Sequence, residues 1–170
     1  NPKTVIKLPC DLKLIATMFH EFVKINNIHP GNNWDSVRVS LPAIDLYGLP
    51  LTNIIMRDYL TPAIESITKL KLTPSYCRLR KYFPGSLLKP HLDRSACQLS
   101  MSFCIEGPQW DINVGPELNP VELYPGKGIV YDGNKLLHGR LESAPGEIIQ
   151  MFNHWVVTGG ECEHAAYDHG

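Results

Sequence analysis

The sequence predicts an α+β protein that is mainly β, with a sandwich or barrel of short strands preceded by two helices. Apolar residues recur at helical spacing over residues 11–28 and 51–70. From Pro74 onward the chain changes to short apolar or alternating stretches separated by turn sequences such as PGS, EGPQ, PGKG and SAPGE. Many short strands at regular spacing are typical of a sandwich or barrel, and we expect the helices to pack against its outside.

The front of the chain supplies the expected helices. Residues 11–28, DLKLIATMFHEFVKINNI, carry an apolar stripe, and Asp11 is suited to cap the first turn. Residues 51–70 repeat the pattern, with Thr52 or Thr61 as the cap and Pro62 at a helix start or a kink. Between them, residues 36–47 alternate well enough for one or two strands interrupted by a proline.

The back of the chain supplies most of the expected strands. They are 76–82, 98–105, 110–114, 121–123, 128–131, 136–141 and 148–157. We expect one domain of 170 residues, in which 1–73 give helical support and a lid, 74–157 form the β core, and 158–170 form a polar tail.

Composition places the chain among ordinary globular proteins. Hydrophobic residues make up 44% and charged residues 19% of it. A net charge of −1 gives no electrostatic reason to expect duplex nucleic acid or an acidic membrane as a partner. No stretch approaches the roughly 20 apolar residues that would span a bilayer. The opening NPKTVIKLPC has neither a starting Met nor a signal-peptide pattern, which fits a chain trimmed at its N-terminus.

The cysteines predict a reducing compartment. There are five, an odd number, and their positions lack CxxC or zinc-knuckle spacing. We therefore expect reduced thiols and a cytoplasmic location, with no catalytic role for any of them.

A His-x-Asp pair in KPHLDRSACQLS is the first candidate for chemistry. His91 and Asp93 also fit a simple turn after a proline, so the pair becomes informative only with a third ligand. His138, in KLLHGRLE on another predicted strand, is that candidate. His154, in FNHWV, is its rival and otherwise reads as a hydrogen-bonded core histidine. Two imidazoles and one carboxylate leave open positions on a metal, as in non-haem Fe(II) oxygenases, whereas structural zinc closes with four ligands.

Three segments then resemble a known family when taken together. CRLRKYFPGSLLKPHLDRSACQLSMSFCI, LYPGKGIVYDGNKLLHGRLE and IIQMFNHWV are similar in order and spacing to the double-stranded β-helix core of Fe(II)/2-oxoglutarate-dependent oxygenases, especially the prolyl-4-hydroxylase-like branch. Tyr82 and Gly85 before the HLD triplet, the PGKG turn and LLHGR carry the resemblance. It implies a jelly-roll, cupin-like core in which His91, Asp93 and His138 hold iron.

The resemblance also implies a co-substrate, 2-oxoglutarate, which would chelate the iron through its keto and C1 carboxylate oxygens, and O2, with ascorbate as a supporting reductant. Such enzymes usually place an Arg or Lys on the strand after the distal histidine to bind the far carboxylate, but this chain has EIIQ at 147–150. Arg140 is the first substitute, because side chains two apart on a strand share a face and it should point inward with His138. Arg80 and Tyr82, also two apart, come next.

Two further residues are expected to meet the substrate. Arg94 lies beside the metal motif, and Trp34 lies in the lid candidate NIHPGNNWDS at 27–36. Each arginine also fits a solvated or salt-bridged side chain.

We therefore expect a dioxygenase that converts 2-oxoglutarate to succinate while hydroxylating an amino acid, a peptidyl residue such as proline, or a small metabolite. The alternative is a cupin-like metal- or small-molecule-binding protein without turnover, favoured by the missing downstream cation. The near-neutral charge disfavours duplex nucleic acid as a substrate.

Overall fold

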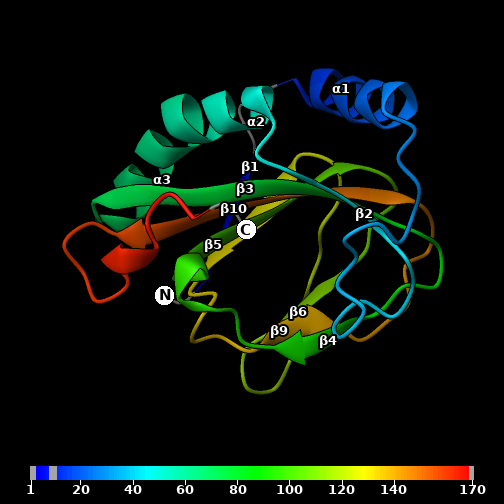
Figure 1. Ribbon diagram of the computed structural model, residues 1–170. Helices are drawn as coiled ribbons and strands as arrows, with labels where there is room; N and C mark the ends of the chain where they lie inside the picture. Colours follow the sequence, from blue (N-terminus) through cyan, green and yellow to red (C-terminus); the bar gives the residue numbers. More distant parts are fainter. Residues whose placement is uncertain (1–2, 8–10, 169–170) are drawn as a thin grey trace.

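In the computed structural model, which describes residues 3–7 and 11–168, three helices cover one face of a β sandwich (Figure 1). The helical elements are α1 (Leu12–Ile25), α2 (Pro50–Ile55), the π-helical segment η1 (Met56–Leu60), α3 (Thr61–Thr68), and the short 3-10 turns η2 (Ser95–Cys97) and η3 (Glu163–Ala165). The strands are β1 (Lys3–Lys7), β2 (Ile44–Tyr47), β3 (Leu72–Tyr82), β4 (Leu88–His91), β5 (Leu99–Glu106), β6 (Ile112–Val114), β7 (Asn119–Val121), β8 (Lys127–Tyr131), β9 (His138–Arg140) and β10 (Ile148–Val157).

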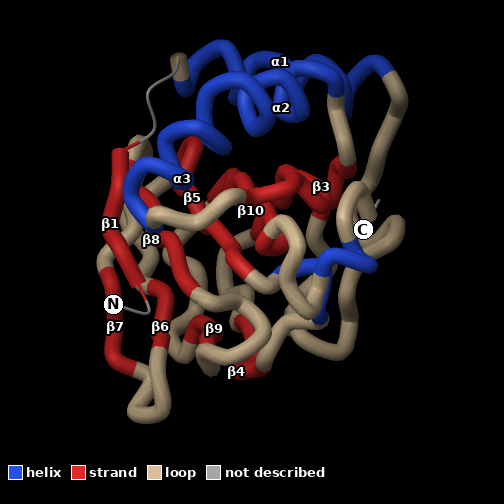
Figure 2. The backbone as a smooth tube through the Cα atoms, turned by 90° about the vertical axis from the view of Figure 1, so that its left-hand side faces the viewer, coloured by secondary structure: helices blue, strands red, loops and turns tan. Residues whose placement is uncertain are grey.

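The strands form two antiparallel sheets that face each other. The six-stranded sheet has the order β1-β8-β5-β10-β3-β2, and the four-stranded sheet has the order β4-β9-β6-β7. From β3 to β10, the chain passes back and forth between the sheets, as in a jelly roll. Figures 1 and 2 show the smaller sheet below the larger one and the helices above it. None of the helices in the described part of the chain is both long and apolar enough to cross a membrane.

Side chains along each strand of the larger sheet alternate between its two faces and so form two separate packing layers. Ile15 and Phe19 of α1 and Leu79 of β3 belong to the apolar cluster between the helices and this sheet. Tyr82 of β3 and Trp110 belong to a second cluster, between the two sheets. The larger sheet is therefore buried on both faces, and the face toward the smaller sheet carries the site described below.

The first helix follows the sequence prediction. Asp11 caps it, because its Oδ1 accepts a hydrogen bond from the backbone N–H of Lys13 at 3.0 Å. The helix ends at Ile25, and the last residues of the predicted range form turns instead.

The segment predicted to be helical over 51–70, with Pro62 at a helix start or a kink, is helical in three consecutive pieces from Pro50 to Thr68. The segment is interrupted by η1, and Pro62 lies in the first turn of α3, where its missing N–H cannot extend the hydrogen-bond ladder. The Thr61 hydroxyl donates to the Met56 carbonyl at 2.7 Å, and the Thr52 hydroxyl donates to that of Leu49 at 2.9 Å. Neither threonine caps a helix, which corrects that part of the prediction, but Pro62 lies at a helix start as expected.

Most strand predictions in the back half agree with the structure, and β10 has the predicted bounds. The strand predicted over 36–47 was largely wrong: only Ile44–Tyr47 forms one, with an isolated bridge between Val39 and Leu88 before it. The strand predicted over 121–123 is displaced to Asn119–Val121, and those over 110–114 and 136–141 are shorter.

Sequence analysis missed β4, whose KPH was assigned to a turn. This edge strand contains a proline, and its pairing with β9 is irregular between Leu88 and His91, so it carries little strand signal.

The predicted polar tail contacts the sandwich over its described residues, which end at 168. Cys162 and Ala165 are buried together with Val156 of β10. Cys77, Cys97, Cys104 and Cys162 are free thiols, as expected, whereas Cys10 lies outside the described residues.

Candidate metal centre

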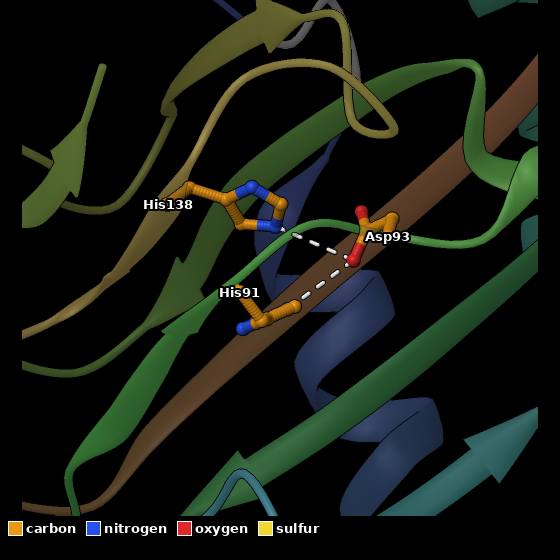
Figure 3. Close-up of side chains that lie close together, drawn as sticks. All are labelled: His91, Asp93 and His138. Atoms are coloured by element: carbon orange, nitrogen blue, oxygen red, sulfur yellow. Dashed lines mark ion pairs between the residues drawn. The ribbon is translucent and has the colours of Figure 1, made fainter. Parts of the chain in front are cut away.

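His91, Asp93 and His138 come together at the strand pair β4–β9 (Figure 3). β4 ends at His91, β9 begins at His138, and the two residues are opposite each other in the antiparallel register. Asp93 follows β4 in a loop, where its backbone N–H donates to the Gly133 carbonyl at 2.9 Å. One strand pair and one loop hydrogen bond thus bring His138 to His91 and Asp93, from which it is far apart in sequence.

The two imidazoles face the same carboxylate oxygen. The Nε2 atoms of His91 and His138 lie 3.2 and 3.4 Å from Asp93 Oδ1. The ring centroids are 4.5 Å apart, and one donor atom from each residue lies within 4.8 Å of the other two. All three side chains are at most 14% exposed. One ion could therefore contact all three.

Backbone carbonyls orient both imidazoles. Nδ1 of His91 lies 2.6 Å from the Lys89 carbonyl oxygen, and Nδ1 of His138 lies 2.8 Å from that of Leu136. A carbonyl oxygen can only accept, so each Nδ1 carries a hydrogen and each Nε2 is turned toward Asp93. Such outer hydrogen bonds are how proteins orient metal-binding histidines.

Asp93 is held in its charged form. Burial raises the pKa of its carboxyl group, but the neighbouring His138 and His91 outweigh that effect and keep the pKa well below its usual range. A metal-binding carboxyl group must be deprotonated, and the surroundings of Asp93 meet that condition.

His154, the rival ligand, faces the same cavity from β10. Its Nδ1 lies 2.8 Å from Ser100 Oγ, and its buried Nε2 has no partner among the described residues. With Asp93 and Cys97 it forms a second group of three donors within 4.8 Å. Burial lowers the pKa of His154 to about 3 and raises the pKa of the Cys97 thiol to about 12, so that group offers a thiol rather than a thiolate at neutral pH. The donor chemistry favours the group with two histidines.

Arg140 lies in the cavity that reaches the candidate ligands. It follows His138 by two residues on β9 and is 2% exposed. Its Nη1 donates to the Trp110 carbonyl at 2.5 Å, and its guanidinium lies 4.2 Å from the centroid of the Trp110 ring. Among the described residues, its Nε and Nη2 have no hydrogen-bond partner and no carboxylate forms an ion pair with it. Burial lowers the pKa of this guanidinium.

Arg80 and Tyr82 line the same cavity from β3. Arg80 Nε donates to Asp45 Oδ1 at 2.8 Å and Nη1 donates to the Tyr82 hydroxyl at 3.2 Å, which leaves Nη2 without a partner. The Tyr82 ring contacts Trp110 edge to face, with centroids 4.9 Å apart. Tyr82 therefore stands between Arg80 and the tryptophan that holds Arg140.

Arg94 lines the cavity, but its charge is already paired. Two of its nitrogens donate to the Asp168 carboxylate at 2.9 and 2.7 Å, and the guanidinium lies over the Tyr76 ring. Trp34 packs against the cluster between the sheets, and its indole N–H donates to the Val39 carbonyl at 2.9 Å. Its role and that of Arg94 toward substrate remain predictions.

Sequence analysis assigned no site role to Arg78, Asp45 or Phe152. Arg78 shares the inner face of β3 with Arg80, and Asp45 of β2 is opposite Arg80 in the register. Arg78 and Phe152 line the cavity together. The alternation in Tyr-x-Arg-x-Arg-x-Tyr, residues 76–82, could have identified Arg78, but Asp45 was assigned to a strand whose partner was unknown.

Neither a protein-family model nor a curated protein sequence matches the chain. Solved structures do match it. A viral collagen prolyl hydroxylase from Paramecium Bursaria Chlorella virus-1, in complex with 2OG, has a TM-score of 0.65 and 14% identity, over 92% of this chain and 97% of that one. A Pseudomonas putida prolyl-4-hydroxylase has a TM-score of 0.64 and 15% identity, over 92% of both chains.

EctD from S. alaskensis, with bound Fe, has a TM-score of 0.66 and 13% identity, over 94% of this chain and 74% of that one. At such identities the likeness concerns the fold. It confirms the predicted α+β, mainly β jelly roll with N-terminal helices outside.

Proposed function

We propose that this chain is an Fe(II)- and 2-oxoglutarate-dependent dioxygenase that hydroxylates a C–H bond of an amino acid, a peptidyl residue such as proline, or a small metabolite. The observation that supports this most strongly is the convergence of two imidazole Nε2 atoms and one carboxylate oxygen in a cavity lined by arginines. The fold shared with prolyl hydroxylases and EctD adds support.

The donor set fits iron better than structural zinc. His91, Asp93 and His138 offer two neutral nitrogens and one carboxylate, a set that leaves metal positions open for other ligands. A structural zinc site would need a fourth protein ligand, usually a thiolate. When bound, iron would supply the chemistry by which O2 oxidises both 2-oxoglutarate, to succinate and CO2, and the C–H bond, to an alcohol. The chain itself holds the donors in place through the carbonyls of Lys89 and Leu136.

Arg140 is the residue we assign to the distal carboxylate of 2-oxoglutarate. Its Nε and Nη2 are buried donors without partners, and a carboxylate can accept from both at once. It shares a strand face with His138, so both side chains reach the same cavity. The main argument for a binding protein without turnover was the missing cation at 147–150, and an inward-facing arginine at 140 weakens that argument.

The cavity walls would also keep water away from the reacting groups. Leu88, Ile112 and Phe152 line it beside the arginines, and each is at most 7% exposed. In such an environment the attraction between Arg140 and a carboxylate is stronger than in water.

The ligand assignment can be tested by metal binding alone. His91→Ala, Asp93→Ala and His138→Ala should each abolish stoichiometric Mn(II) binding, measured anaerobically by calorimetry, while circular dichroism shows an intact fold. His154→Ala is the matched control and should bind Mn(II) nearly as well as the wild type. Loss of binding in His154→Ala with retention in His138→Ala would contradict the assignment.

Turnover is tested separately. Protein with Fe(II), ascorbate and O2 should release succinate from 2-oxoglutarate, slowly alone and faster with a substrate from an amino-acid and peptide panel. Protein that carries iron but neither binds 2-oxoglutarate nor forms succinate would instead be the cupin-like binding protein.

A further inference from the structure

The cavity contains more positive charge than one 2-oxoglutarate carboxylate can explain. Its lining includes Arg38, Arg78, Arg80, Arg94 and Arg140. Arg94 is paired with Asp168, and Arg38 lies 4.0 Å from Asp35 at the half-exposed rim. If Arg140 binds the distal carboxylate, Arg78 and Arg80 are the arginines whose buried charge still has to be explained.

Arg78 and Arg80 share one carboxylate. Arg80 Nε lies 2.8 Å from Asp45 Oδ1, and Arg78 Nε lies 3.6 Å from the same atom. The side chain of Asp45 is fully buried, that of Arg80 is 3% exposed and that of Arg78 is 16% exposed. Asp45 Oδ2 accepts no hydrogen bond, yet a single carboxylate can neutralise only one of the two guanidinium groups. A positive charge is therefore left over inside the cavity.

Both guanidinium groups stay charged, and each keeps one buried nitrogen without a hydrogen bond to any described residue, although Arg78 Nη1 donates to the Tyr47 hydroxyl at 3.2 Å. Burial lowers the pKa of Arg78, but Asp45 and Tyr47 more than compensate, so its pKa is raised overall, and that of Arg80 is raised as well. Arg78 Nε and Arg80 Nη2 are buried without a hydrogen-bond partner among the described residues. Leaving buried charged donors unsatisfied is costly, so this arrangement is expected where an anion completes it.

This pair is separate from the position assigned to 2-oxoglutarate. Arg78 lies opposite Phe152 in the register of β3 with β10, and the next inward pair along the sheet is Tyr76 opposite His154. Arg140 instead extends from the smaller sheet against Trp110. The excess charge thus lies on the wall of the larger sheet, next to the His154 end of the cavity.

We propose that Arg78, supported by Arg80 and Asp45, binds an anionic group, a carboxylate or a phosphate, of the substrate that is hydroxylated. The inference rests on the proposed function, because it assigns the second of two anions in one cavity. The planar guanidinium of Arg78 suits both kinds of oxyanion, and Asp45 fixes its orientation.

The test uses inorganic phosphate and acetate as probes. Each is titrated at constant ionic strength into anaerobic protein loaded with Mn(II) and saturated with 2-oxoglutarate. Paramagnetic broadening of the phosphate 31P or acetate methyl 1H signal reports binding near the metal. We expect saturable broadening that weakens at least about 10-fold in affinity in Arg78→Gln, because a charged hydrogen-bond donor is lost. The stronger probe identifies the oxyanion of the substrate.

Two further variants and a measurement of 2-oxoglutarate binding separate failure of this inference from failure of the proposed function. Arg57→Gln, which removes an exposed arginine paired with Asp58, should bind the probes like the wild type. Arg78→Lys keeps the charge but loses the planar fork, and should bind with intermediate affinity. If the protein binds 2-oxoglutarate, either of two results overturns the inference: unchanged probe binding in Arg78→Gln, or no saturable probe binding in the wild type. Failure of the wild type to bind 2-oxoglutarate refutes the proposed function itself.

Discussion

Replacing Arg140 by methionine should separate its role in ligand binding from any role in stability. The side chain of Met fills much of the same space but cannot donate a hydrogen bond. Arg140 has two buried nitrogens, Nε and Nη2, free for a carboxylate, and both would be lost. We expect 2-oxoglutarate binding to weaken by about 2 to 5 kcal/mol, or roughly 30-fold or more in affinity. Arg140→Lys should lose less, because a single ammonium keeps the charge without the paired geometry.

The ligand-free protein should respond differently to the same change. Arg140 is buried without a carboxylate partner, and burial already lowers the pKa of its guanidinium. An apolar replacement of a buried charge is often neutral or stabilising. We therefore expect the free energy of unfolding of ligand-free Arg140→Met to stay close to that of the wild type or to exceed it, despite the lost bond to the Trp110 carbonyl.

Calorimetric titration of 2-oxoglutarate into anaerobic, Mn(II)-loaded protein measures the first effect, and urea unfolding measures the second. Mn(II) affinity without 2-oxoglutarate should barely change, which distinguishes an anchor from a metal ligand. Arg57→Met, at an exposed site, is the control. Near wild-type 2-oxoglutarate affinity in Arg140→Met would refute the reasoning and make Arg80 the next candidate.

Three other substitutions test the supporting structure. Gly139→Ala should weaken Mn(II) binding by about 10-fold or more, as measured by calorimetry. A Cβ at this position would lie 2.7 Å from the Leu88 carbonyl oxygen and would displace β4, which carries His91. Wild-type Mn(II) affinity in this variant would contradict the prediction. Thr61→Val should lower the free energy of unfolding, measured with urea, by about 1 to 3 kcal/mol. The buried indole N–H of Trp155, which donates to the Thr61 hydroxyl at 2.8 Å, would lose its acceptor. Burial lowers the pKa of His154 to about 3, so between pH 3 and about pH 6.5 the unfolded state binds more protons than the folded state. The free energy of unfolding should therefore fall as the pH drops through this window, by at most about 1.4 kcal/mol per pH unit. Urea unfolding with EDTA at pH 7 and 5 should show a smaller loss in His154→Gln; equal losses would show that the buried imidazole does not titrate as argued.

Periodicity predicted the long elements well and the short ones poorly. The helix capped by Asp11 and the strand β10 carry an apolar pattern over ten residues or more, so local sequence was sufficient. The four residues of β4 include a proline and pair irregularly with β9. They form a strand because β9 lies beside them, which local sequence does not indicate. The helix start at Pro62 was foreseen, but the π-helical segment before it was not, because the apolar pattern does not distinguish a π-helix from an α-helix.

The candidate ligands were predictable because residue type and order limit them. His91, Asp93 and His138 are the types that hold a metal, and the fold brings them within 4.8 Å of one another. The contact of Arg78 and Arg80 with Asp45 was not predictable, since it depends on the register of β2 against β3. A strand face can be inferred from alternation, but the neighbour across the sheet cannot.

The larger sheet packs against helices on one side and encloses the cavity on the other. Along β3, Leu79 faces the helices while Arg78 and Arg80 face the cavity, and along β10 Met151 and Phe152 divide in the same way. The cavity-lining positions of these strands can thus be changed without touching the layer between the sheet and the helices. A library restricted to the inward positions should yield variants that accept new molecules and still express as folded protein.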